Sequence, residues 1–151
     1  MNVADLINQD SILLNIESKS KKHILETISG NLANGDSGQK DTIFDKLYER
    51  EKLGTTAFGH GIAIPHARVP NINSPKILFI KLSQGIDFDA LDKKKVDLIF
   101  SLIVPDTEDD SHIEILSKVA SIADSETFVQ KIRDLSDKEK ILDLLKNNLQ
   151  S

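Results

Sequence analysis

The longest apolar segment of the chain reads VDLIFSLIV and extends from Val96 to Val104. It is too short to span a bilayer, which takes about 20 apolar residues in a helix. It also carries Asp97 and Ser101 in its interior. A short run of branched apolar residues is typical of a strand in a protein core. The segment therefore predicts a buried strand.

Helices and further strands are predicted on both sides of this segment. Helical spacing of apolar residues marks the helices, and Ser111–Glu114 and Ser136–Glu139 have the form of capping boxes. In chain order, the predicted elements are a strand at 12–16, a helix at 21–33, a loop at 34–38, a helix at 41–53, strands at 76–82 and 96–104, and helices starting at 111, 125 and 136. Because helices alternate with strands, the predicted fold class is α/β.

The composition is that of one globular domain. The chain has 151 residues, enough for a single domain over residues 1–151, with 39 % hydrophobic and 28 % charged residues. The formal net charge of −5 argues against general nucleic-acid binding, which requires a basic face. The chain has no cysteine, which excludes disulfides and thiol catalysis. No signal sequence is visible at the N-terminus, so we expect a cytoplasmic protein that does not insert into a membrane.

The segment most suggestive of chemistry reads GHGIAIPHAR, from Gly59 to Arg68. Pro65 fixes its own φ and pushes Ile64 towards an extended conformation, so His66 is predicted to stand at the end of a strand. The two glycines let the backbone bend or let another group approach. An imidazole displayed in this way can accept and hand on a group near neutral pH. A structural histidine is the competing interpretation, and spacing alone does not decide between the two.

Two further residues are candidates for a site with His66. The capping box places His112 at the first helical position, where unpaired N–H groups and the helix dipole favour an anion such as a phosphoryl group. A solvated helix start is the alternative. Arg50, late in a predicted helix, could grip phosphate oxygens or could merely pair with acids along the helix. Arg68 competes with Arg50 for the phosphate-binding role.

At Gly61–His66, which reads GIAIPH, the sequence resembles the mannitol/fructose-type enzyme IIA family of the bacterial phosphoenolpyruvate-dependent sugar phosphotransferase system. The resemblance covers roughly residues 12 to 145 and includes REKLGTT at 50–56, IDFDALD at 86–92, VDLIF at 96–100, Val104-Pro105 and HIEILSKVA at 112–120. The chain is most similar to the stand-alone nitrogen-regulatory IIA proteins. Its segment Lys21–Glu26 resembles the first helix of those proteins. It departs from them at His60, where they usually have Asn, and at Ala67, where they often have Gly.

This resemblance implies a fold, a chemistry and partners. The family fold is a mixed β-sheet flanked by helices. His66 would be the phosphorylated residue, as a tele-phosphohistidine on Nε2, with His112 as a second active-site histidine and Arg50 as a supporting arginine. A histidine phosphocarrier protein of the HPr type would donate the phosphate, and regulatory proteins or a IIB domain would be the further partners. The resemblance implies no cofactor and no metal.

Three alternatives remain open on the sequence alone. The chain could be a sugar-specific IIA that passes phosphate to a IIB partner. It could be a metal-dependent hydrolase built on His60, His66 and His112, although their spacing matches no metal signature. It could also be a binding module without phosphoryl chemistry. In a regulatory role, phosphorylation would switch partner binding through charge, and Gly59–Arg68 would form the apolar surface that a carrier protein covers.

Overall fold

The computed structural model describes residues 2–107 and 111–150. Its strands are β1 (Ile12–Ile16), β2 (Ala57–Gly59), β3 (Ile62–Ala63), β4 (His66–Val69), β5 (Lys76–Ile86) and β6 (Val96–Pro105). Its α-helices are α1 (Lys21–Ala33), α2 (Ser37–Lys52), α3 (Ser111–Ala123), α4 (Glu126–Asp134) and α5 (Lys138–Leu149). Two short 3-10 turns, Val3–Leu6 and Gln9–Ser11, precede β1.

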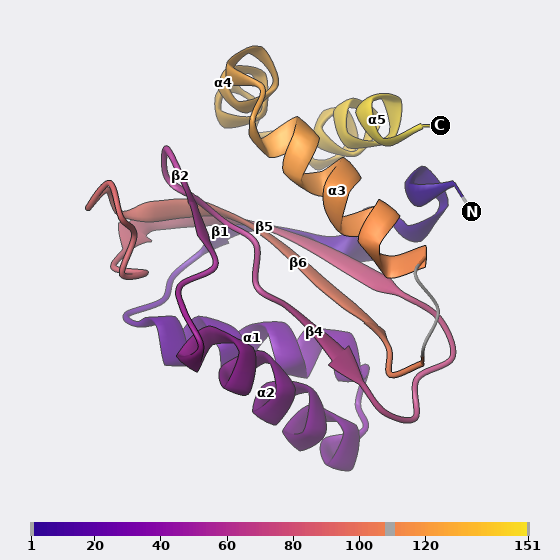
Figure 1. The fold of residues 1–151 in the computed structure, drawn as a ribbon. Helices are drawn as coiled ribbons and strands as arrows, with labels where there is room; N and C mark the ends of the chain where they lie inside the picture. Colours follow the sequence, from indigo (N-terminus) through magenta and orange to yellow (C-terminus); the bar gives the residue numbers. More distant parts are fainter. Residues whose placement is uncertain (1, 108–110, 151) are drawn as a thin grey trace.

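The described residues form three layers, with a sheet between two groups of helices (Figure 1). The strand order is β1-β5-β6-β3-β2, and β4 also pairs with β6. The pairs β1–β5, β3–β6 and β4–β6 are parallel, whereas β5–β6 and β2–β3 are antiparallel. Helices α1 and α2 cover one face, and α3, α4 and α5 cover the other (Figure 1). The prediction of an α/β fold with a mixed sheet flanked by helices is confirmed.

Strand β6 lies at the centre of the sheet and contributes side chains to the hydrophobic core on each of its two faces. Leu98, Phe100 and Leu102 pack into the core beneath α3, α4 and α5, whereas Ile99 and Ile103 pack into the core above α1 and α2. A strand covered on both faces needs apolar side chains at successive positions. This explains why apolar residues stand at successive positions in 98–100 and 102–104, and it confirms the predicted buried strand.

Strands β3 and β4 are two parts of one line that is interrupted beside β6. Ala63 is paired with Ile99 and His66 with Leu102, so the register is the same before and after the interruption. Pro65 has no backbone N–H to donate, but its carbonyl accepts hydrogen bonds from the Leu102 N–H and the Ser101 hydroxyl, both at 3.0 Å. The backbone before His66 is thus anchored to the buried strand β6.

The predicted elements agree with the structure at most positions, but β5 extends to Ile86 rather than ending at Leu82, and three further predictions fail. Helix α2 begins at Ser37, not at 41, because Asp36 caps it by accepting from the Gln39 N–H. The last helix is capped by Asp137 rather than by Ser136, so the second capping box is wrong. The short strands β2, β3 and β4 were not predicted as separate elements. They depend on hydrogen bonds to distant segments, which local patterns do not report.

In the part of the chain that the structure describes, none of the helices combines the length and the apolar character needed to cross a bilayer.

Candidate functional site

A cleft of about 690 Å³ opens between α2, β4 and α3. It brings together the two histidines and two arginines that the sequence analysis singled out for phosphate chemistry. They are Arg50 from α2, His66 and Arg68 from β4, and His112 from α3. Lys46 and Lys52 add positive charge to the lining, and Glu49 is its acidic member. The charge of the cleft therefore suits an anion, although the whole chain is acidic.

His66 is the first residue of β4, which confirms its predicted place at a strand end. Its Nδ1 lies 2.8 Å from the carbonyl oxygen of Ile64. A carbonyl can only accept, so Nδ1 must carry the proton in this hydrogen bond. In the neutral ring, Nε2 then holds the lone pair. The structure thus leaves Nε2 as the nitrogen with the free lone pair in the neutral ring, a choice that the sequence did not allow.

The surroundings of His66 also keep its ring neutral. Burial lowers the pKa of the imidazole, and the nearby positive charge of Arg50 lowers it further. The hydrogen bond to Ile64 and the carboxylate of Glu51 act in the opposite direction, but the pKa remains below its ordinary value. A histidine with a lowered pKa keeps its nucleophilic lone pair at neutral and mildly acidic pH.

Arg50 lies in the last turn of α2, where a positive charge is favoured by the helix dipole. Its Nη1 donates to the carbonyl oxygen of Gly54 at 2.9 Å, which ties the side chain to the end of the helix. A guanidinium has five N–H donors in one plane. One bond to Gly54 therefore orients the group while other donors remain for an anion in the cleft.

His112 and Arg68 approach each other across the cleft. Arg68 donates from Nη2 to Nε2 of His112 at 2.5 Å. Because a guanidinium can only donate, Nε2 of His112 is the acceptor in this hydrogen bond. Helix α3 begins at Ser111, so His112 is its second residue rather than the first. The acidic run Glu108-Asp109-Asp110 and the Ser111 side chain of the predicted capping box lie outside the described residues.

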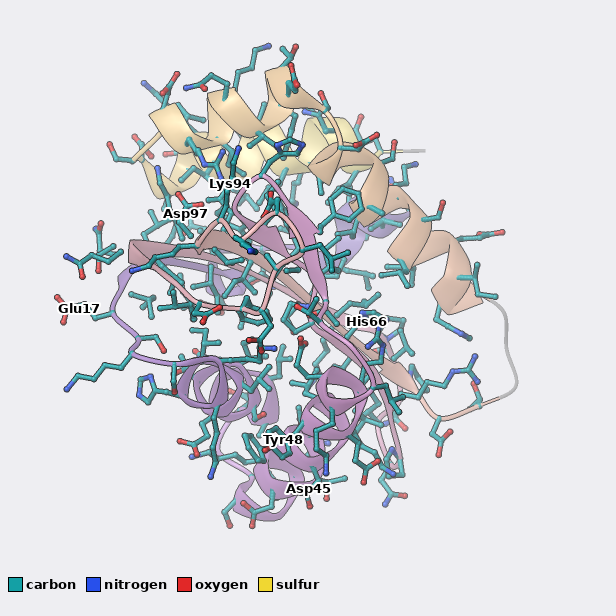
Figure 2. The ribbon with its side chains drawn as sticks, turned by 60° about the vertical axis from the view of Figure 1, so that its left-hand side comes forward. Glu17, Asp45, Tyr48, His66, Lys94 and Asp97 are labelled. Carbon is teal, nitrogen blue, oxygen red and sulfur yellow. The ribbon has the colours of Figure 1, made fainter. Side chains whose placement is uncertain are left out.

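His60 belongs to a second cleft, of about 670 Å³, which also contains Lys94, Asp97 and Arg133. Figure 2 shows Lys94 and Asp97 well apart from His66. The three histidines of the hydrolase alternative are thus divided between two clefts. In residues 2–107 and 111–150, the structure contains no group of three His, Cys, Asp or Glu side chains placed to hold a metal ion.

The expected apolar docking surface at Gly59–Arg68 is wrong. Ile62, Ala63 and Ile64 are 1 %, 0 % and 5 % exposed, because β3 and the interruption that follows it lie in the core. The exposed apolar side chains of the cleft come from other elements. They are Leu53 after α2 and Ile113 on α3, which are 85 % and 56 % exposed. A partner that covered His66 would meet these two residues.

Several residues that hold the candidate site in place had no predicted role. Ser101 is completely buried and anchors the Pro65 carbonyl. Its signal was a hydroxyl among the apolar residues 98–104, since a buried hydroxyl needs a hydrogen-bond partner. Glu51 and Thr56 form a buried pair behind the cleft, with their atoms in direct contact. Both stand inside a quoted motif, but only the tertiary structure shows what they contact.

The sequence profile of the family "Phosphoenolpyruvate-dependent sugar phosphotransferase system, EIIA 2" matches residues 5–148. The chain is 39 % identical to a nitrogen regulatory protein of Pseudomonas aeruginosa over 88 % of this chain and 87 % of that protein. It is 36 % identical to a fructose-specific EIIA component of Haloferax volcanii over 70 % and 69 % of the two chains.

A solved structure is similar to this chain over nearly its whole length. The crystal structure of the nitrogen regulatory protein IIA-Ntr from Neisseria meningitidis superposes with a TM-score of 0.88 at 33 % identity, covering 95 % of this chain and 98 % of that one.

Proposed function

Because the chain belongs to the EIIA 2 family of the phosphoenolpyruvate-dependent sugar phosphotransferase system, we propose that it is a phosphoryl carrier that takes the phosphoryl group on Nε2 of His66. One observation carries this proposal. The hydrogen bond from Nδ1 of His66 to the Ile64 carbonyl directs the lone pair of the ring to Nε2, in a cleft that is rich in cationic groups.

The transfer is an in-line exchange between two nitrogens. The lone pair on Nε2 of His66 attacks the phosphorus of a phosphohistidine on the donor protein. The bond from phosphorus to the donor nitrogen breaks, and its electron pair returns to the donor imidazole. Charge in the loose transition state is spread over the three phosphoryl oxygens. Positioning and electrostatic stabilisation are therefore the protein's main contributions.

Arg50 and His112 support this exchange without being phosphorylated themselves. Arg50 reaches the cleft from the end of α2, where its bond to Gly54 fixes the direction of the guanidinium. His112 approaches from α3 together with Arg68. Both arginines carry planar sets of donors that match phosphoryl oxygens. Arg68 can exchange its bond to His112 for a bond to the incoming group, which places two positive charges beside the dianion.

The donor is a histidine phosphocarrier protein of the HPr type, and the role is regulatory, as the similarity to nitrogen regulatory proteins favours. Phosphorylation adds nearly two negative charges at the centre of the cleft. A target that buries the neutral cleft would have to bury this dianion as well, which is costly without a matching cation. Targets should therefore distinguish the two phosphorylation states.

A second candidate is the sugar-specific role, in which the phosphoryl group passes to a IIB partner. The similarity to a fructose-specific EIIA component favours it. The two roles differ in their acceptors rather than in the chemistry at His66. A purified fructose-type IIB that accepts the phosphate within one turnover would favour the sugar-specific role.

The test is phosphoryl transfer from phosphoenolpyruvate through purified enzyme I and the phosphocarrier protein to the purified chain. We expect one acid-labile phosphate per molecule, and phosphorus and nitrogen NMR should place it on Nε2 of His66. The absence of labelling, or a phosphate on Nδ1, would contradict the proposal. Binding of a candidate target to the neutral and the phosphorylated chain, measured by calorimetry, then tests the regulatory role.

A further inference from the structure

Glu51 is a buried acid for which the transfer chemistry has no direct use. It follows Arg50 on α2, its side chain is only 3 % exposed, and it is absent from the lining of the cleft. Its carboxylate has three hydrogen-bond partners. Oε1 accepts from the hydroxyl of Thr56 at 2.5 Å, and Oε2 accepts from the Thr56 backbone N–H at 2.8 Å and from Nζ of Lys21 at 3.2 Å.

A buried carboxylate is an expensive way to fill a core. Its desolvation must be offset by hydrogen bonds and an opposite charge, and apolar residues of similar volume often stabilise a fold equally well. Burial by itself lowers the pKa of Lys21, but the hydrogen bonds and charges of Asp89 and Glu51 outweigh this and raise it above its ordinary value. Lys21 is thus held as a cation beside Glu51. This arrangement points to a need for fixed geometry.

The atoms that Glu51 fixes lead directly to His66. Glu51 grips both the N–H and the side chain of Thr56. The Thr56 carbonyl accepts from the Ile64 N–H at 3.0 Å. The Ile64 carbonyl in turn accepts from Nδ1 of His66 at 2.8 Å. Two backbone residues therefore connect the buried carboxylate to the proton that decides which nitrogen of His66 is nucleophilic.

We propose that Glu51 is a positioning residue of the His66 site, which fixes Thr56 and, through it, holds the Ile64 carbonyl where it accepts the hydrogen bond from Nδ1–H of His66. The consequence for phosphoryl transfer rests on the function proposed above, whereas the control of the ring's tautomer does not. Glu51 also has an electrostatic effect on the ring. Its negative charge supports the protonated form of His66, against burial and Arg50.

The experiment uses three variants of the full chain. Glu51→Ala removes the grip on Thr56. Glu51→Gln keeps it, because the amide oxygen can accept from the Thr56 N–H and the amide nitrogen can donate to the Thr56 hydroxyl, but it removes the charge. Asp45→Asn, at an exposed position on the same helix, is the matched control for a lost charge. Figure 2 shows Asp45 far from His66.

Nitrogen NMR of the ring reports the tautomer without any phosphate. We expect one Nδ1–H tautomer in the wild type and Asp45→Asn, a mixture of tautomers in Glu51→Ala, and a single tautomer again in Glu51→Gln. The titration midpoint of His66 should fall in Glu51→Gln, because a charge that supports protonation is lost. Transfer to Glu51→Ala should slow by about 10- to 100-fold, as small misplacements of reacting groups do.

A folded Glu51→Ala that keeps a single Nδ1–H tautomer and the wild-type transfer rate would overturn the proposal. If Glu51→Ala does not fold, Thr56→Val takes its place, since it removes only the hydroxyl that Oε1 accepts from. In that variant we expect a smaller fraction of the Nε2–H tautomer than in Glu51→Ala. A single Nδ1–H tautomer in Thr56→Val would also contradict the proposal. If the wild type shows the expected tautomer but accepts no phosphate, the proposed function fails and the positioning role stands.

Discussion

The His66 cleft and the His60 cleft have nearly the same volume, about 690 and 670 Å³, and very different contents. The first gathers His66, His112 and two arginines against apolar side chains. In the second, Arg133 is engaged by Asp97 at 2.8 Å and by the carbonyl of His60 at 2.7 Å. The first gathers cationic side chains that suit an anion, whereas in the second Arg133 is held by a carboxylate and a carbonyl and helps to fix the turn at His60. The two clefts therefore differ in how their charged groups are used and not in their volume.

The two clefts are also supplied by one short segment. His60 and His66 belong to Gly59–Arg68, yet they end in different clefts. His60 and Gly61 form a two-residue hairpin loop in which both have positive φ, of 56° and 83°. The turn places His60 in the second cleft, while the interruption at Pro65 places His66 in the first. Each of the following predictions tests this division of labour.

The largest effect is expected when the two histidines are exchanged for alanine one at a time. His66→Ala should carry no acid-labile phosphate after incubation with phosphoenolpyruvate and the upstream carriers. His60→Ala should be labelled to the same extent as the wild type, because its side chain lies in the other cleft. Circular dichroism and thermal unfolding control for the fold. Full labelling of His66→Ala, or loss of labelling in His60→Ala, would break the comparison.

The next effect is on rate. Arg50→Ala and His112→Ala should still be phosphorylated on His66, but single-turnover transfer should slow by about 10²–10³-fold if each removes one transition-state contact. Quenched-flow measurement of the transfer from the phosphorylated carrier gives this rate. The control is Arg133→Ala, which removes an arginine of the second cleft. If Arg50→Ala and His112→Ala both transferred at the wild-type rate, neither residue would contribute to the transition state.

Much of the fold could be predicted because it is written in local patterns. Helix α1 begins and ends where its apolar spacing and the Ser20 cap indicate. The apolar composition of β6 predicts a buried strand, and Pro65 predicts that His66 lies at a strand end. The start of α2 was missed because its first turn, at Ser37 and Gly38, has no apolar periodicity. A single capping side chain, Asp36, decides where that helix begins.

The sequence pointed to residues that line one cleft, but it did not show how they are arranged there. Arg68 and His112 are 44 residues apart and meet only because β4 and α3 lie beside the same cleft. The tautomer of His66 depends on a carbonyl two residues earlier, whose direction is set by pairing with Thr56. The separation of His60 from His66 depends on backbone angles. Such features arise from contacts between distant segments, so no local pattern contains them.

The third prediction concerns the stability of the second cleft. An added Cβ at Gly61 would lie 2.5 Å from Nη2 of Arg133, and the positive φ of Gly61 disfavours a side chain. Gly61→Ala should therefore cost about 1–2 kcal/mol for the backbone alone, and more because Arg133 must move. Gly35→Ala is the matched control, since Gly35 also has a positive φ, of 91°, but nothing lies within 4 Å of its added Cβ.

Denaturant unfolding compares these two variants. Gly61→Ala should lose about 1 kcal/mol more than Gly35→Ala, the usual net value of a hydrogen bond. Labelling of His66 should remain normal in both, because the first cleft does not depend on Arg133. Equal losses of stability would show that the contact with Arg133 contributes nothing, and slower labelling of Gly61→Ala would show that the two clefts are coupled.

The smallest effect is the dependence of stability on pH in the first cleft. Burial and Arg50 lower the pKa of His66 in the folded protein below its value of 6.5 in the unfolded chain. Between these two values the unfolded chain binds more protons, so stability rises with pH. The contribution of His66 to the free energy of unfolding is fully present above pH 6.5 and is lost as the pH falls through the pKa of the folded protein.

His66→Gln does not titrate, so it serves as the reference. On acidification the free energy of unfolding of the wild type should fall relative to that of His66→Gln. Arg50→Met removes a charge that lowers this pKa and should narrow the window. Unfolding free energies measured from about pH 5 to pH 8 report both effects, across the range in which histidine titrates. A difference that stayed constant with pH would mean that His66 is no more shielded from protons in its cleft than in the unfolded chain.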